Sequence, residues 1–237
     1  MEQNAAIDGW PDDFSGTVRL FPLPNLVLFP HVVQPLHIFE PRYCDMLTES
    51  VATDKLIAMA LLKTGWEPQY KSRPEVAKTI CVGKIISHTP TEDGRHNILL
   101  LGMKRAEIIR EHESKKSFRA ADVKICDDLY PAEDAGGREH LIQRLRDLFS
   151  RIVPEGFAAQ ESFQQLVGQD LPLGILTDTI TYALNLPLSI KQQLLAEFNV
   201  DIRSRLLIRC LEQQLKSRES TEPSTMTDEF PPKFSQN

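Results

Sequence analysis

Two Ser-Lys pairs in the sequence carry the residue types from which a serine nucleophile and its base are built. Ser189 lies two residues before Lys191, and Ser114 directly precedes Lys115. Such a dyad needs a nucleophile, a base and an oxyanion hole arranged in space, which closeness in the sequence does not provide. Ser189 instead precedes the segment IKQQLL, where a serine favours a helix N-cap. We therefore predict no catalytic residue.

The six histidines are the other candidates for chemistry. His31 and His37 flank one predicted strand, but Pro35 between them argues against a shared face, and no nearby cysteine or HxxxH pair completes a zinc site. We expect surface or edge histidines. The 11 glycines form no GxxxxGK loop followed by Ser or Thr, the pattern that cradles phosphates. The sequence thus predicts no metal site and no cofactor.

Glu40 and Arg42 flank Pro41 at the start of a predicted helix. A carboxylate at this position complements the helix dipole, and an arginine can tie the helix to the rest of the fold. Contact with a binding partner is the alternative for both. Arg105 has the same two interpretations, an ion pair that stabilises the fold or a contact.

The composition is that of an ordinary soluble globular protein: 237 residues, 41% hydrophobic and 25% charged. The net charge of −6 argues against a strongly basic nucleic-acid binder. The N-terminus lacks the features of a signal peptide, and no segment approaches the roughly 20 apolar residues of a membrane span, so we expect a cytoplasmic protein without a membrane contact. Four widely spaced cysteines form no CxxC pair and are predicted to be reduced core residues: Cys44, Cys81, Cys126 and Cys210.

The elements that must position these residues begin with a proline-rich segment, residues 20–47, with five prolines among nearly continuous apolar residues. Proline excludes a long helix or a central strand here and favours short extended pieces joined by bends. The helix that Pro41 begins would plug or cap a small barrel. The strands predicted in this part are 18–21, 26–29 and 34–39, and the helix covers about 41–51.

The next predicted strands carry a clear hairpin signal. The Asp-Gly pair in Thr91–Gly94 tolerates positive φ, so 82–88 and 96–101 should pair across it. Gly102 is interpreted as a tight turn into another strand. About seven short strands in sequence are typical of a closed or nearly closed barrel. The remaining predicted strands are 56–62, 79–87, 106–111 and 118–125.

After Pro131 the period changes to that of helices. Pro172 and Pro187 lie near helix starts, and Asp201 is a plausible N-cap. The sequence predicts a flexible N-terminus over 1–13, a β domain over 14–128, a helical domain over 131–216 and a disordered tail over 217–237. The helices are expected at 138–153, 161–167, 173–184, 189–198 and 202–215.

Three blocks of sequence resemble a known family, the N-terminal substrate-binding domain of Lon proteases and its stand-alone relatives. They are LFPLPNLVLFPHVVQPLHIFEPRY, VGKIISHTPTEDGRHNILLLGMKRAEI and LTDTITYALNLPLSIKQQLLAEFNVDIRSRLLIRCLE, and together the resemblance covers about 17–215. It implies an α+β fold, a PUA-like β pseudo-barrel followed by a C-terminal helical bundle. In Lon enzymes this unit precedes an ATPase and a Ser-Lys protease, neither of which we expect here.

The resemblance implies a non-catalytic module that binds unfolded polypeptides or a protein partner. An RNA-binding PUA-like protein is the alternative, because 13 Lys or Arg stand against 10 Asp or Glu between residues 63 and 128. Only Phe118 lies among these cations for base stacking, so a solvated charged face is the simpler interpretation. The missing phosphate loop argues against an ATP-dependent peptidase. The candidate basic patch comprises Lys104, Arg105, Arg110, Lys115, Lys116 and Arg119.

We expect the partner-binding surface at the proline-rich corner, where apolar residues are too dense for all of them to be buried in a small barrel. Phe39 and part of 26–29 are also expected to supply core. The candidate binding residues are Phe29, Pro30, Val32, Val33 and Phe39, with Glu40 and Arg42 beside them.

Overall fold

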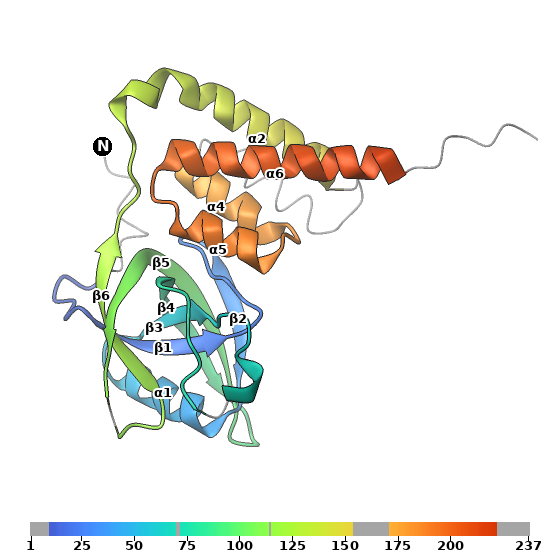
Figure 1. Cartoon of the computed structure of the whole chain (residues 1–237). Coiled ribbons are helices and arrows are strands. Elements are labelled where there is room, and N and C mark those ends of the chain that lie inside the picture. Colours follow the sequence, from blue (N-terminus) through green and yellow to red (C-terminus); the bar gives the residue numbers. More distant parts are fainter. Residues whose placement is uncertain (1–9, 70–71, 114, 154–170, 222–237) are drawn as a thin grey trace, which may run out of the picture.

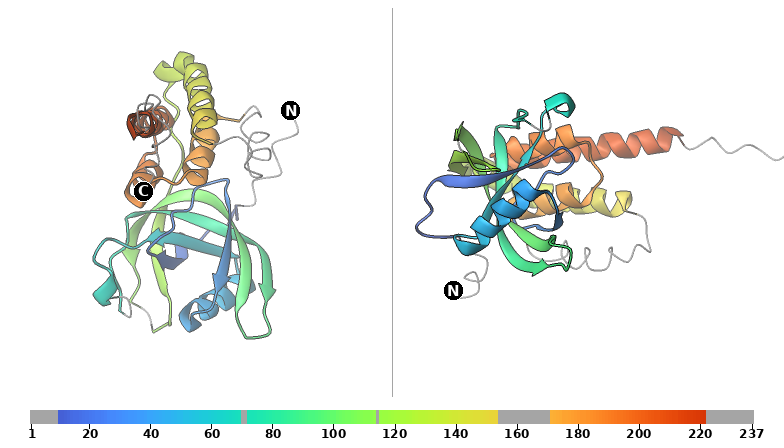
Figure 2. Two further views of the ribbon diagram at one scale, coloured as in Figure 1. Left: turned by 90° about the vertical axis from the view of Figure 1, so that its right-hand side faces the viewer. Right: turned by 90° about the horizontal axis from the view of Figure 1, so that it is seen from below.

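A computed structural model of the chain describes residues 10–69, 72–113, 115–153 and 171–221. A β unit with one helix forms one end of the molecule, and a group of helices lies on the other end of that unit (Figure 1). Two further views show the same separation of the two units (Figure 2). The predicted α+β class, with a β-rich first half and a helical second half, is confirmed.

Six strands form one sheet in the order β2-β5-β4-β3-β1-β6. β6 pairs with β1 and also with the second half of β5, so the sheet curls into a pseudo-barrel that leaves β2 on an edge. About seven strands were predicted; of the predicted ranges, 26–29 is not a strand, and 96–101 and 106–111 both belong to the single strand β5. The strands are β1 (Thr17–Leu23), β2 (Val33–Ile38), β3 (Leu56–Leu61), β4 (Thr79–Pro90), β5 (His96–Glu111) and β6 (Arg119–Cys126).

Gly102 is not a turn between two strands, because β5 runs through it as one continuous strand. A Cβ at this position would lie 2.0 Å from the carbonyl oxygen of Phe29. The Gly102 amide donates to the Val32 carbonyl at 2.8 Å, and the His31 amide donates to the Gly102 carbonyl at the same distance. Gly102 is therefore required by the close approach of two backbones rather than by a bend.

Residues 26–29 were predicted as a strand but belong to no strand. Their side chains are nevertheless core: Val27, Leu28 and Phe29 are buried. The segment crosses β5 at Gly102, and its apolar run is explained by burial alone.

The positions of Pro35 and Pro41 are explained by the missing amide hydrogen and the fixed φ of proline. Pro35 lies exposed on β2, which pairs only with β5, so the missing amide hydrogen removes no bond from a central strand. The Gln34 side-chain amide donates to the Pro35 carbonyl at 2.7 Å. Pro41 is the first residue of α1 (Pro41–Ala52), as predicted, and α1 lies at the end of the β unit away from the other helices (Figures 1 and 2).

The second half contains four described helices, and the predicted helix at 161–167 lies outside the described residues. Pro172 and Pro187 are the N-cap residues of α4 and α5, so Ser189 is inside its helix and does not cap it. The last helix continues to Thr221, five residues beyond the predicted end of the helical domain. The helices are α2 (Arg138–Ile152), α4 (Leu173–Ala183), α5 (Leu188–Ala196) and α6 (Val200–Thr221), with short 3-10 turns at Glu67–Gln69 and Ala132–Gly137.

Asn199, not Asp201, caps α6. The Asn199 side-chain oxygen accepts hydrogen bonds from the backbone amides of Asp201 at 3.0 Å and Ile202 at 3.1 Å. Asp201 is fully buried inside the first turn, where its carboxylate pairs with Arg138 at 2.9 Å. The prediction placed the cap two residues too late because both residue types favour the position.

One hydrophobic core runs through both units. It joins Phe29 and Ile57 of the β unit to Leu176 and Leu207 of the helices in a single cluster of buried side chains. A second, smaller cluster fills the other side of the sheet, and Trp10 packs against it. The shared core means that the two units bury each other's apolar surface.

Of the four cysteines, only Cys81 is a core residue, and burial raises the pKa of its thiol to about 12. The other three are half-buried: Cys44 packs against the larger core, whereas the prediction of a core position is wrong for Cys126 and Cys210. All four are free thiols. None of the described helices has both the length and the apolarity needed to cross a membrane.

Candidate functional site

The candidate binding residues of the proline-rich corner differ in how far they are exposed. Phe29, Pro30 and Val32 are buried, so none of the three belongs to an exposed apolar surface. Val33 is 41% exposed and Phe39 is 60% exposed. Phe39 was also expected to supply core, and its exposure overturns that expectation.

Glu40 and Arg42 pair with each other. The Arg42 guanidinium donates to the Glu40 carboxylate from Nε at 3.1 Å and from Nη2 at 2.9 Å, and it lies 4.7 Å from the centre of the Tyr43 ring. Glu40 is the N-cap residue of α1, but its side chain makes no capping hydrogen bond. This pair was not predicted: Glu40 was expected to complement the helix dipole, and Arg42 to tie the helix to the rest of the fold.

Exposed apolar side chains from β2, β4 and β5 gather on the outer face of the sheet. Val33 and Pro35 point outward because strand side chains alternate, and Pro35 stands opposite Leu99 on β5. Leu99 is 37% exposed, and Ile86 is 50% exposed where an irregularity in the β4–β5 register adds a residue. We call these residues, together with Phe39, the outer strip: Val33, Pro35, Phe39, Ile86 and Leu99.

Polar groups lie between and beside the residues of the outer strip. The His37 ring lies between Pro35 and Phe39 in sequence, contacts the Phe39 ring at a centroid distance of 6.0 Å, and makes a 2.8 Å hydrogen bond with the Asn97 side chain. Ser87 and Thr89 are exposed on β4 beside it. His37 and Asn97 thus lie between Phe39 and the pair Pro35–Leu99, so the strip combines apolar and polar side chains, as protein-binding surfaces do.

Sequence reasoning found Val33 and Phe39 but missed three members of the strip. Leu99 could have been found, because the predicted hairpin and the alternation of residues 96–101 place it on the face opposite to the buried Ile98 and Leu100. Pro35 was noted as a strand breaker and not as surface. Ile86 depends on the register shift, for which the sequence carries no signal.

A buried ion cluster fixes the helices on the β unit. Arg105 of β5 is 2% exposed and donates from Nη2 to Asp178 of α4 at 2.6 Å and from Nη1 to Asp128 at 3.2 Å. Burial opposes the charge of Arg105, but the two carboxylates outweigh it and raise the pKa of the guanidinium. The ion-pair interpretation of Arg105 is thus correct, and its partner belongs to another block of the sequence.

Arg203 of α6 completes this cluster. Its guanidinium donates to Asp128 at 2.6 Å and 3.0 Å, and its Nε lies 3.2 Å from the Asp178 carboxylate, a separation at which the charges attract although no hydrogen bond forms. Gly174 leaves the necessary room, because a Cβ there would lie 2.5 Å from an Asp128 oxygen. We call the four charged residues the junction cluster: Arg105, Asp128, Asp178 and Arg203.

A hollow of about 500 Å³ lies beside the junction cluster, between β5 and the start of α4. Its apolar lining includes Pro30, Met103 and Ile175, and its polar lining includes His31 and Lys104. Pro30 therefore lines this hollow and not the outer strip. The hollow is a concave region in which a ligand could be held.

The predicted basic patch is largely neutralised by ion pairs. Carboxylates lie within 3.2 Å of the charged groups of Lys104, Arg110, Lys116 and Arg119, and Arg105 is buried in the junction cluster. Among the described residues, no group of three or more His, Cys, Asp or Glu side chains is placed to hold a metal ion. The Ser114–Lys115 pair cannot be assessed because Ser114 lies outside the described residues. Lys191 donates to the Tyr182 carbonyl at 3.0 Å.

Comparison with known proteins gives one consistent family. A family model described as the ATP-dependent protease La (LON) substrate-binding domain matches residues 17–213. The Lon protease of Aquifex aeolicus is 25% identical over 198 residues, which are 83% of this chain and 25% of that protein. The Lon protease of Xanthomonas oryzae is 26% identical over 84% of this chain. The chain spans about a quarter of the length of these curated relatives.

Two solved structures share the fold. The N-terminal domain of a Mycobacterium avium complex Lon protease matches with a TM-score of 0.65 at 17% identity, covering 83% of this chain and 98% of that one. The Lon N-terminal domain protein of Xanthomonas campestris matches with a TM-score of 0.56 at 21% identity, covering 84% and 97%.

Proposed function

Because the chain belongs to the ATP-dependent protease La (LON) substrate-binding domain family, we propose that it is a non-catalytic module that binds exposed apolar segments of unfolded polypeptides or of a protein partner. The family match covers the substrate-binding domain and no catalytic domain, which supports a binding role without chemistry. The outer strip is the observation that carries this proposal.

The apolar side chains of an unfolded segment are exposed to water, and contact with the outer strip would bury some of them. Burial of apolar surface contributes about 25 cal/mol per Å², so contact with a few exposed side chains gives modest affinity. Interfaces at the small end of the size range are weak and reversible. Such binding suits a module that must hold many different segments and release them.

The binding mode follows from the edge strand β2, which carries two of the five residues of the strip. A segment added to β2 as a further strand would need regular backbone donors and acceptors along its free edge. Pro35 has no amide hydrogen, and its carbonyl already accepts from the Gln34 side chain. The outer strip therefore binds side chains across its face and does not extend the sheet.

The strip is held on rigid elements. Val33, Ile86 and Leu99 lie on strands that pair with one another, and the Tyr182 hydroxyl donates to the Gln34 side chain at 2.8 Å, which links α4 to β2. A surface that is ordered before binding loses less conformational entropy when a ligand arrives.

RNA binding, the alternative function, receives less support from the charged surface. A nucleic-acid site needs cations that can face phosphates, whereas the basic side chains at residues 104, 110, 116 and 119 lie in ion pairs with carboxylates. Binding of RNA with a steep dependence on salt would favour that alternative.

We predict that the double variant Val33→Asp/Phe39→Asp loses binding of an unfolded model polypeptide, such as reduced and carboxymethylated lactalbumin. Two carboxylates on the outer strip would have to be desolvated on binding, so the dissociation constant should rise at least about tenfold. Both positions are exposed, so the free energy of unfolding should change by less than about 1 kcal/mol. Fluorescence anisotropy and urea unfolding measure the two quantities.

The matched control is Ile109→Asp/Ile202→Asp, which adds the same charge at two exposed apolar positions outside the strip. It should bind as wild type does. By contrast, Val32→Asp places an unpaired charge at a buried position and should unfold the protein. The same substitution at Val32 and at its neighbour Val33 should therefore have different effects on stability. A Val33→Asp/Phe39→Asp protein that is stable and binds the polypeptide as tightly as wild type would refute the proposed surface.

A further inference from the structure

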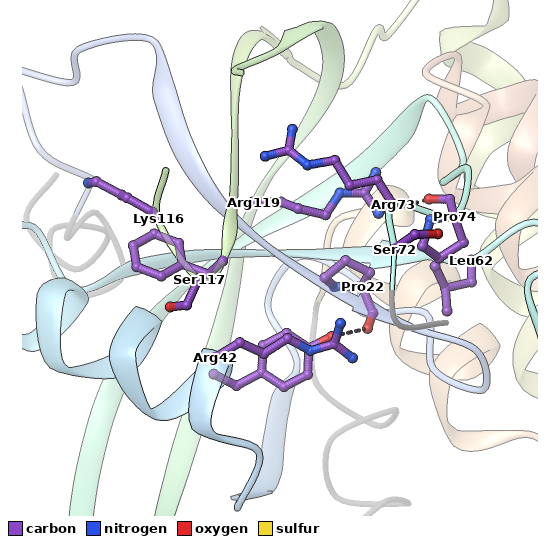
Figure 3. Close-up of a pocket in the computed structure, with 11 residues that line it drawn as sticks. Pro22, Arg42, Leu62, Ser72, Arg73, Pro74, Lys116, Ser117 and Arg119 are labelled. Atoms are coloured by element: carbon purple, nitrogen blue, oxygen red, sulfur yellow. Dashed lines mark hydrogen bonds between the residues drawn. The ribbon is translucent and has the colours of Figure 1, made fainter. Parts of the chain in front are cut away.

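A small pocket opens where the start of α1 meets β1, the loop after β3 and the segment before β6 (Figure 3). Its volume is about 80 Å³. Its apolar lining includes Tyr43, Leu62 and Phe118, all of them buried. The Tyr43 hydroxyl donates to the carbonyl of Pro22, another lining residue, at 3.2 Å and so fixes the aromatic ring.

Three arginines from separate segments line this pocket: Arg42, Arg73 and Arg119 (Figure 3). Among the described residues that line the pocket, none is acidic. We call it the arginine pocket. Arg42 and Arg119 are paired with Glu40 and Glu111, so an anion would be bound here mainly through the N–H donors of the three guanidinium groups and not through a large excess of positive charge.

Each guanidinium is held in place by groups of the protein. Arg42 is held by Glu40, and Arg73 donates to the backbone carbonyl of His112 at 2.9 Å. Arg119 donates to the Pro74 carbonyl at 2.8 Å and to Glu111 at 2.9 Å. Neither carboxylate lines the pocket. The arginines are thus oriented before a ligand arrives, which lowers the entropic cost of binding it.

Lys116 also lines the pocket. Its ammonium group lies 5.3 Å from the centre of the Phe118 ring and pairs with Glu49. Arg42 and Tyr43 also belong to the first turn of α1, where the positive end of the helix dipole favours anions.

We propose that the arginine pocket binds one small oxyanion, of the size of a carboxylate or a phosphate group. The volume of about 80 Å³ is sufficient for one carboxylate or phosphate group. Guanidinium groups recognise carboxylate and phosphate oxygens through the same paired N–H donors. The source is therefore either a free inorganic anion or the terminal or side-chain acid of a polypeptide.

The test is a titration of the isotope-labelled full chain with sodium phosphate at constant ionic strength, with chloride as the balancing anion, followed by amide NMR. A second arm uses one short peptide with a free and with an amidated C-terminus, to distinguish a free anion from a polypeptide acid. We expect saturable shifts at Tyr43, Arg73 and Phe118 with phosphate, with the free-acid peptide, or with both.

Arg73→Gln should weaken this binding at least about tenfold, because the variant loses a charged hydrogen-bond donor at an exposed position where folding is not at risk. Arg95→Gln, which removes a charge from the β4–β5 turn, is the control and should leave the affinity unchanged. The proposal is overturned if neither probe gives saturable shifts at the pocket, or if Arg73→Gln binds as wild type does. It is independent of the proposed polypeptide binding at the outer strip.

Discussion

Replacing Asp178 by asparagine is expected to lower the free energy of unfolding by about 3 to 5 kcal/mol, the usual cost of removing one partner from a buried ion pair. Asp178 is 1% exposed and lies between Arg105 and Arg203. Without its charge, two buried guanidinium groups would share the single carboxylate of Asp128, which is already hydrogen bonded to both. Urea unfolding monitored by circular dichroism measures the change.

The matched control for this prediction is Asp127→Asn. Asp127 is also paired with a cation, Lys104 at 2.9 Å, but its side chain is exposed. Exposed pairs contribute at most about 1 kcal/mol, so the control should stay within that range. If Asp178→Asn were no more destabilising than Asp127→Asn, the junction cluster would not be what holds the helices on the β unit.

Gly102→Ala is expected to cost about 3 kcal/mol or more, at the upper end of the range for overpacking. The added methyl group would lie 2.0 Å from the Phe29 carbonyl oxygen and 3.3 Å from the Cys81 sulfur. A backbone oxygen cannot rotate away as a side chain can, so β5 and the segment crossing it must separate. The thermal midpoint and the free energy of unfolding should both fall.

Gly136→Ala provides the comparison, because a Cβ at Gly136 meets nothing within 4 Å. Its effect should stay within about 0.5 kcal/mol, as for an ordinary surface change. A Gly102→Ala protein as stable as the Gly136→Ala protein would mean that the two backbones are not in close contact.

Local signals of the sequence were sufficient for several elements. Pro41 starts α1 as proline at a first helical position should, and Gly94 has a φ of 78° in the turn of the β4–β5 hairpin. The switch to helical periodicity after Pro131 also marks the real change of architecture. These features depend on residues that are neighbours in the chain, which is why they can be predicted.

The features that failed depend on contacts between distant residues. Gly102 was taken for a turn because a glycine in a strand and a glycine in a turn look alike until the partner backbone is known. The burial of Val32 and the exposure of Val33 follow from alternation only once the strand is known to start at Val33. For the same reason, nothing in the sequence indicates that Arg105 and Asp178, which are 73 residues apart, form an ion pair.

The most direct test of polypeptide binding by the outer strip is methyl NMR of the chain labelled at Ile, Leu, Val and Met, with an unlabelled unfolded polypeptide added. Binding at the outer strip predicts that the methyl signals of Val33, Ile86 and Leu99 shift, while those of Ile109 and Ile202 stay unchanged. The contradicting result is that the polypeptide binds, those three signals do not move, and the signals of Met103 and Ile175 shift instead. The polypeptide would then lie in the hollow beside the junction cluster and not on the outer strip.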